Sequence, residues 1–98
     1  MMQLHFVGKN IEVTPALKDI TTQKMQALEK RYNHISKINV VFEVEHVTNI
    51  AEATVFISGS EIHAAAKDED MYKAIDILVA KLAGQITKHK EKIIDSHR

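Results

Sequence analysis

Three successive segments between residues 37 and 67 alternate apolar and polar side chains, and this pattern restricts the fold more than any other feature. The segment KINVVFEVEHV (37–47) puts Ile38, Val40, Phe42 and Val44 on one side. The segments AEATVFIS (51–58) and EIHAAAK (61–67) do the same with Ala53, Val55, Ile57, Ile62, Ala64 and Ala66. A period of two is typical of strands that bury one face. We therefore expect three consecutive strands whose apolar residues share a face.

The links between these segments are short. The link between the first two segments runs through Thr48 and Asn49, and Gly59 and Ser60 separate the second from the third. Short links between alternating segments favour antiparallel hairpins. A further alternating segment, MQLHFVG at residues 2–8, predicts a fourth strand at the start of the chain.

Two segments have helical spacing instead. Residues 13–32 are expected to form a helix that Thr14 caps and Pro15 begins. A longer helix is expected from Asp70, its N-cap, to Ile94. The inner residues of the two predicted helices are Leu17, Ile20, Thr21, Leu28 and Tyr32 in the first, and Met71, Ala74, Ile75, Leu78, Leu82, Ile86 and Ile93 in the second.

The predicted order of elements is β-α-β-β-β-α. One apolar face per strand and one apolar stripe per helix are best buried in two layers. The expected fold is α+β, a four-stranded sheet with both helices packed on one face. The length of 98 residues fits a single domain over residues 1–98.

Composition excludes several classes of protein. The absence of cysteine rules out a disulfide scaffold and a thiolate metal site. The first residues lack the basic and apolar regions of a signal peptide, and no run approaches the roughly 18 apolar residues of a membrane span. These features predict a soluble protein of the cytoplasm.

Acidic and basic residues balance at 13 each, so their positions matter more than their sum. The alternation assigns Glu43, Glu45, Glu52 and Glu61 to the open face of the sheet, which is then acidic. The candidate contacts for an anionic partner lie on the helices: Lys24 and Arg31 on the first, and Lys81, Gln85, Lys88, Lys90 and Lys92 on the second. Such helical cations are suited to phosphate groups.

A second explanation needs no ligand. Acids at a helix start and bases at its end complement the helix dipole, by about 0.3–1 kcal/mol each when exposed. Asp68, Glu69 and Asp70 precede the second helix, and lysines lie near its end. From the pattern alone, both a solvated helix and an anion-binding helix stay open.

Catalytic and metal-binding patterns are not found in the sequence. His5, His46 and His63 fall on strands and could hold adventitious metal, but the six histidines include no ligand motif such as HExxH. Asp76 is expected to be solvated. We therefore predict no enzyme activity, no cofactor and no dedicated metal site.

The segments EIHAAAKDEDMYKAID and KLAGQITKHKEK resemble those of the short ribosome hibernation-promoting factors, in the ribosome-associated inhibitor and sigma-54 modulation protein family. GKNIEVTPALKDITTQKMQALEK resembles that family's first loop and helix, and VEHVTNIAEATVFISGSEIHA its hairpin and the next strand. The resemblance covers nearly the whole chain. It implies a fold similar to a double-stranded-RNA-binding domain.

The resemblance also implies a function. Such proteins bind the small (30S) ribosomal subunit in the channel for mRNA and tRNA, and block translation in stationary phase. The short form favours inactive 100S ribosome dimers together with a ribosome modulation factor. The basic helical surface contacts 16S rRNA, which by motif position assigns that role to Lys24, Lys81, Gln85, Lys88, Lys90 and Lys92. Gly84 stands where relatives often carry arginine, and Ala80 where an acid is common.

Two other functions stay open at this point. A modulator of a sigma factor would bind protein, through the sheet with Glu43, Glu45 and Phe56. A general double-stranded-RNA binder would bind free duplex RNA as well as it binds the subunit. The free protein is expected to be monomeric.

Overall fold

The computed structural model describes the backbone of residues 2–32 and 34–96, and the side chains of these residues as far as Lys88. The predicted order of elements is confirmed. They are β1 (Gln3–Lys9), α1 (Pro15–Arg31), β2 (Ile35–Glu45), β3 (Thr48–Ile57), β4 (Ser60–Asp68) and α2 (Met71–Ser96).

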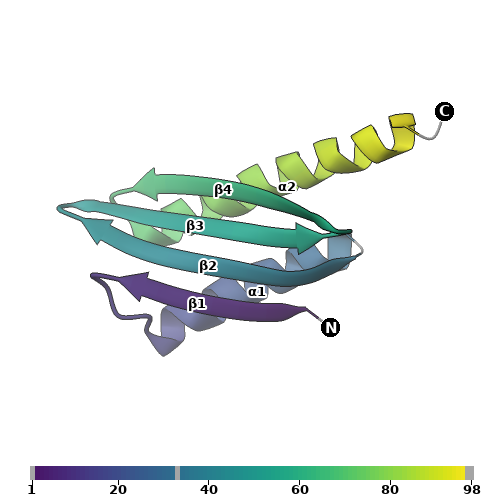
Figure 1. Cartoon of the computed structure of the whole chain (residues 1–98). Coiled ribbons are helices and arrows are strands. Elements are labelled where there is room, and N and C mark those ends of the chain that lie inside the picture. The colour runs from purple at the N-terminus through teal and green to yellow at the C-terminus, as the bar shows by residue number, and fades with distance from the viewer. Residues whose placement is uncertain (1, 33, 97–98) are drawn as a thin grey trace.

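The four strands form one mixed sheet in the order β1-β2-β3-β4. β1 runs parallel to β2, with α1 as the connection, and the other neighbouring strands are antiparallel. Both helices cover the same face of this sheet, and the opposite face is open (Figure 1). The predicted α+β fold with two layers is therefore confirmed, and the comparison with a double-stranded-RNA-binding domain stays a prediction.

The core lies between the sheet and the helices. It consists of the inward residues of β2, β3 and β4 together with the inner stripes of α1 and α2, and the inward residues of β1 are half-buried against it. Phe42, Met25 and Leu82 are among its fully buried side chains. Burying side chains of this size contributes about 1.5–3 kcal/mol each, so the alternation that sets them inward also fixes the strand register.

The first hairpin turn lies two residues before its predicted position. Thr48 and Asn49 belong to β3, and the turn is formed by His46 and Val47. His46 has a φ of 55°. Two-residue hairpins favour positive φ, and Asn or Gly usually supplies it. The prediction was wrong because His-Val carries neither of these signals.

The second hairpin turn is also shifted, by one residue. Ser58 and Gly59 form it, with φ values of 49° and 77°, and Ser60 begins β4. A turn with both central residues at positive φ matches the twist of the two flanking strands. Gly59 supplies this conformation without strain.

Most of the predicted helical details are confirmed, with a few differences in the stripes. The Thr14 hydroxyl accepts a hydrogen bond from the Leu17 amide at 3.2 Å, as an N-cap does, and Pro15 is the first helical residue. Met25 is fully buried although it was not predicted in the inner stripe, whereas Ile20 and Val44 are only half-buried. Ile93 lies beyond the described side chains.

The two helices run side by side in the same direction. Lys24 meets Asp76, and Tyr32, eight residues or about 12 Å further along α1, meets Thr87. The Tyr32 hydroxyl lies 3.0 Å from the Thr87 hydroxyl and 3.4 Å from the Ala83 carbonyl oxygen. Both helices therefore end at the same end of the molecule, where α2 extends beyond the sheet (Figure 1).

Gly8 lies where the chain folds back beneath β1. A Cβ at this position would lie 2.3 Å from the Ile11 carbonyl oxygen and 3.1 Å from Val13 Cγ2. We predict that Gly8→Ala lowers the free energy of unfolding by about 1–3 kcal/mol, because backbone atoms would have to move to admit the methyl group. Urea denaturation followed by circular dichroism measures this. Unchanged stability would contradict the close approach.

Gly84 provides the opposite case within α2. A Cβ at this position would meet no atom within 4 Å. Gly84→Ala is therefore expected to raise the free energy of unfolding by about 1 kcal/mol, because alanine loses less backbone entropy in a helix. The same denaturation experiment tests it, and a loss of stability would show that the space around Gly84 is needed.

Candidate nucleic-acid interface

The fold separates the charges of a chain whose net charge is zero. α1 carries four basic and two acidic residues, and α2 carries five basic and three acidic residues. The helices therefore hold a formal charge of +4, and the rest of the sequence holds −4. Because both helices lie on one side of the sheet, this difference in sequence becomes a difference between two faces.

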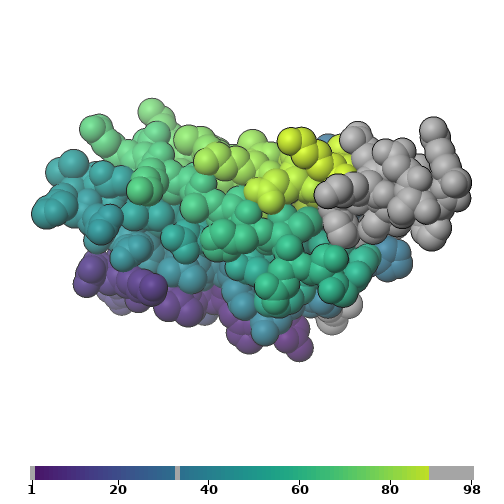
Figure 2. Space-filling view, turned by 45° about the horizontal axis from the view of Figure 1, so that its top comes forward, coloured from purple at the N-terminus to yellow at the C-terminus, as the bar shows by residue number. Residues whose placement is uncertain are grey.

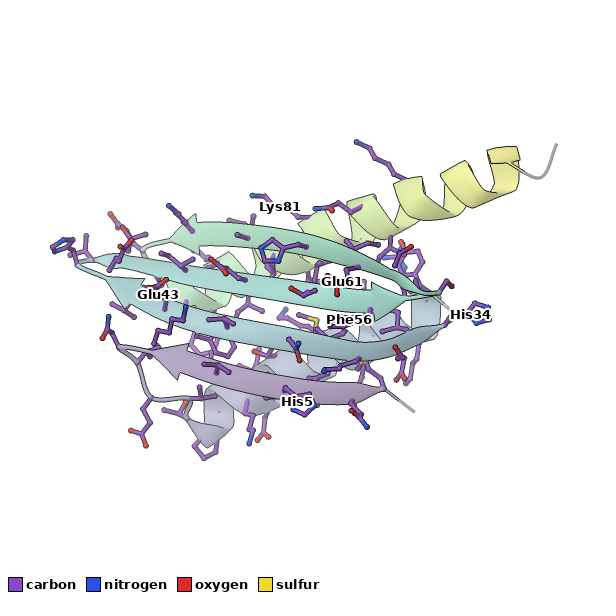
Figure 3. The ribbon with its side chains drawn as sticks, in the orientation of Figure 1. His5, His34, Glu43, Phe56, Glu61 and Lys81 are labelled. Atoms are coloured by element: carbon purple, nitrogen blue, oxygen red, sulfur yellow. The ribbon has the colours of Figure 1, made fainter. Side chains whose placement is uncertain are left out.

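The open face of the sheet is less acidic than predicted. Glu43, Glu45, Glu52 and Glu61 do share it, and Glu43 and Glu61 are seen there in Figure 3. The strand register adds three lysines to the same face: Lys9, Lys37 and Lys67. Lys9 pairs directly with Glu43 across β1 and β2. The prediction overestimated the negative charge of this face. It counted the four glutamates and left out the three lysines that the strand register places on the same face.

Phe56 lies half-buried on this open face, as its place in the alternation predicts (Figure 3). The Lys37 ammonium lies 5.2 Å from the centre of its ring. A cation over an aromatic ring is stabilising by about 0.5–1 kcal/mol at exposed sites. Phe56 therefore has a partner within the chain.

The strand histidines do not come together. His5 and His63 occupy the same row across the sheet, with Asn39 and Thr54 between them. Three strand spacings separate them by about 14 Å. His46 lies in the first hairpin turn. Within the described residues, no group of three histidine or carboxylate side chains could hold a metal ion.

Lys81 and Gln85 contact the free edge of the sheet. Lys81 Nζ donates to the Ala65 carbonyl oxygen at 2.8 Å, and Gln85 Nε2 donates to the His63 carbonyl oxygen at 2.9 Å. Both acceptors belong to β4, the last strand of the sheet, and Lys81 lies beyond its edge in Figure 3. Unpaired edge groups invite pairing with another chain, so these side chains protect the edge as well as extending from it. No pattern within the sequence indicates this contact.

Lys24 forms an ion pair with Asp76. Its Nζ lies 2.5 Å from Asp76 Oδ1, which links α1 to α2. Asp76 is solvated as expected, with its side chain 61% exposed, but it is also paired. The sequence could not show this, because the pair depends on how the two helices align.

Arg31 lies at the end of α1, where its guanidinium is 5.4 Å from the centre of the Tyr32 ring. The same tyrosine reaches Ala83 and Thr87 of α2 through its hydroxyl. Arg31 therefore contacts the same tyrosine that links the two helices.

The remaining candidate contacts for an anionic partner lie further along α2. Lys88 is exposed. The backbone of Lys90 and Lys92 is helical, but their side chains lie outside the described residues, as does that of His89.

The described contacts divide α2 into two flanks. The α1 flank contains Asp76, Ala83 and Thr87, which contact α1. The β4 flank contains Lys81, Gln85 and Lys88. At about 100° per residue, these lie roughly 140°, 180° and 120° around the helix from Asp76. Figure 2 shows α2 lying against β4 without a hollow between them. The predicted site residues thus fall on two separate surfaces.

The acids before α2 have a local role. The Asp70 carboxylate accepts from the Tyr72 amide and the Asp68 carboxylate accepts from the Asp70 amide, both at 2.9 Å. The Asn49 side chain donates to the Glu69 carbonyl oxygen at 2.6 Å. The predicted N-cap at Asp70 is confirmed, and capping explains this end of the helix without a ligand. The lysines on the flanks need a separate explanation.

Over the part of the chain that the structure describes, neither helix has an apolar stretch long enough to cross a membrane.

Comparison with known proteins finds a matching family model and similar named relatives. The family model described as sigma 54 modulation protein / S30EA ribosomal protein matches residues 4–94. The chain is 49% identical over 92 residues to the ribosome hibernation promoting factor of Klebsiella oxytoca, with 94% of this chain and 97% of the relative covered. It is 43% identical over 94 residues to the ribosome hibernation promoting factor of Azotobacter vinelandii, with 96% of this chain and 88% of the relative covered.

Two solved structures are similar to this fold over most of the chain. A ribosomal subunit interface protein from Coxiella burnetii superposes with a TM-score of 0.83 at 33% identity, covering 93% of this chain and 99% of that one. The N-terminal domain of Thermus thermophilus Protein Y gives a TM-score of 0.82 at 29% identity, covering 91% and 99%.

The contact of Tyr32 with α2 gives a prediction for the alignment of the helices. Tyr32→Phe is expected to lower the free energy of unfolding by about 0.5–1.5 kcal/mol, because the hydroxyl that meets Thr87 and Ala83 is lost. Tyr72→Phe is the matched control, since Tyr72 is exposed and should change by less than about 0.5 kcal/mol. Equal effects in thermal denaturation would contradict the bracing role of Tyr32.

Proposed function

The chain belongs to the sigma 54 modulation protein / S30EA ribosomal protein family, as its resemblance predicted, and on this basis we propose that it silences ribosomes by binding the small subunit. Its relatives include ribosome hibernation promoting factors and a ribosomal subunit interface protein. The observation that carries the proposal is the +4 charge of the two helices on one side of the sheet.

The proposed site is the 30S channel for mRNA and tRNA, with 16S rRNA as the surface contacted. Occupying this channel would block translation in stationary phase. Together with a ribosome modulation factor, the bound protein would favour inactive 100S dimers. In this proposal residues 1–98 act as one ribosome-binding domain, monomeric when free, in the cytoplasm.

The physical basis is charge and shape. Lysine and arginine on helices bind phosphate oxygens and orient a protein on RNA without reading the bases. Structured RNA is recognised mainly through its backbone and shape. The candidate contacts are Lys24, Arg31, Lys81, Gln85, Lys88, Lys90 and Lys92. No described group suggests a chemical step at this surface.

Replacing Lys88, Lys90 and Lys92 together by glutamate tests the surface. We expect this variant to lose co-sedimentation with purified small subunits, because three attractive charges become repulsive in a binding mode dominated by phosphate. Circular dichroism shows whether the variant is folded.

The matched control makes the same change on the other face. Lys9, Lys37 and Lys67 lie on the open sheet face, so replacing all three by glutamate gives the same net charge. We expect this control to keep most of its binding. Equal losses would show that only net charge matters and would contradict a helical site.

The open sheet face leaves one alternative, suggested by the family description and by Phe56 with its neighbouring glutamates. A sigma-factor modulator would bind protein through this face. Binding to a sigma factor that is kept in the helical triple variant and lost in the triple variant of the sheet face would favour this alternative.

A general double-stranded-RNA binder is the other function left open. Such a protein would be released from small subunits by an equal concentration of free duplex RNA.

A further inference from the structure

We infer that the phosphate contacts of the proposed function run along the β4 flank of α2, through Lys81 and Lys88 with Gln85 between them, and that Lys24 is a positioning residue and not a contact. This inference rests on the proposed function and divides its candidate residues. It follows from what Lys81, Gln85 and Lys24 already contact within the chain.

On the β4 flank, Lys81 is held in place without losing its charge. Lys81 Nζ has three N–H donors and gives one to the Ala65 carbonyl oxygen, which is neutral. The other two donors remain for a phosphate. Gln85 is held in the same way by the His63 carbonyl oxygen. Side chains that are already ordered lose less conformational entropy on binding, so this flank is preorganised.

The α1 flank has the opposite arrangement. Lys24 is 36% exposed, but the carboxylate of Asp76 is its partner and is itself 61% exposed. A phosphate that approached Lys24 would also approach this carboxylate, and the two negative charges would repel each other. The pair is therefore close to neutral toward RNA, and its effect is to hold α1 beside α2.

The alignment it maintains serves the β4 flank. α2 is held on one side by Lys24 of α1 and by Tyr32, which caps the end of α1, and on the other by the β4 carbonyl groups. These contacts fix the rotation of the helix about its axis. That rotation determines whether Lys81, Gln85 and Lys88 project along the edge of the sheet together.

The salt dependence of binding separates contacts from positioning residues. Each phosphate contact adds about 0.7–0.9 to the slope of log K against log salt concentration. We expect Lys81→Gln and Lys88→Gln each to lower this slope by about one unit on purified small subunits. Glutamine keeps a donor at position 81, so the β4 edge stays capped.

The control removes the ion pair without changing net charge. The double variant Lys24→Gln, Asp76→Asn should keep the salt slope of the unmodified protein, although its thermal stability can fall slightly. The single variant Lys24→Gln is not a substitute, because it leaves the Asp76 carboxylate facing the RNA.

The outcomes are distinct. A double variant whose slope falls as much as that of Lys81→Gln would overturn the inference and make Lys24 a phosphate contact, leaving the proposed function intact. An unchanged slope for Lys81→Gln and Lys88→Gln would also overturn it. If the unmodified protein does not bind small subunits at low salt, the proposed function fails and the inference fails with it.

Discussion

Burial of one face of a four-stranded sheet by two helices is the constraint on which the rest of this structure depends. Because each strand has only one apolar side, both helices must pack on the same side, and their basic residues follow them. The charge difference between helices and strands is thereby turned into two different surfaces on a protein of zero net charge. Electrostatic attraction to RNA does not require a basic protein, because a local field is sufficient to guide association.

The parallel alignment of α1 and α2 determines how the basic surface is organised. It places Lys24 beside Asp76 and Tyr32 beside Thr87, so the flank of α2 toward α1 is used largely for packing. The other flank meets the edge of β4, where lysine and glutamine cap backbone carbonyl groups. The same side chains can thus prevent pairing with another strand and present charge to a phosphate. The acids at the start of α2 are explained by capping alone.

The fold was accessible from the sequence because alternation and helical spacing report directly on burial. Phe42, Val55 and Leu82 were all expected inside and are. The turns were displaced because His46 and Ser58 take positive φ without the usual Asn or Gly signal. The candidate site was harder to predict from the sequence. Lys24 and Lys81 could be placed on helices, but their partners, Asp76 and Ala65, come from elements distant in sequence, and no periodicity within one element identifies them.

Lysine footprinting of the subunit-bound protein tests the central claim most directly, because each face of the molecule carries its own lysines. An acylating reagent would be applied to free and bound protein, and the modification of each lysine measured by mass spectrometry. Protection of Lys81 and Lys88, with Lys9, Lys37 and Lys67 reacting as in the free protein, is the result expected if the helical face lies against rRNA. Protection of the three sheet lysines, with Lys81 and Lys88 still reactive, would contradict it and identify the open sheet face as the binding surface.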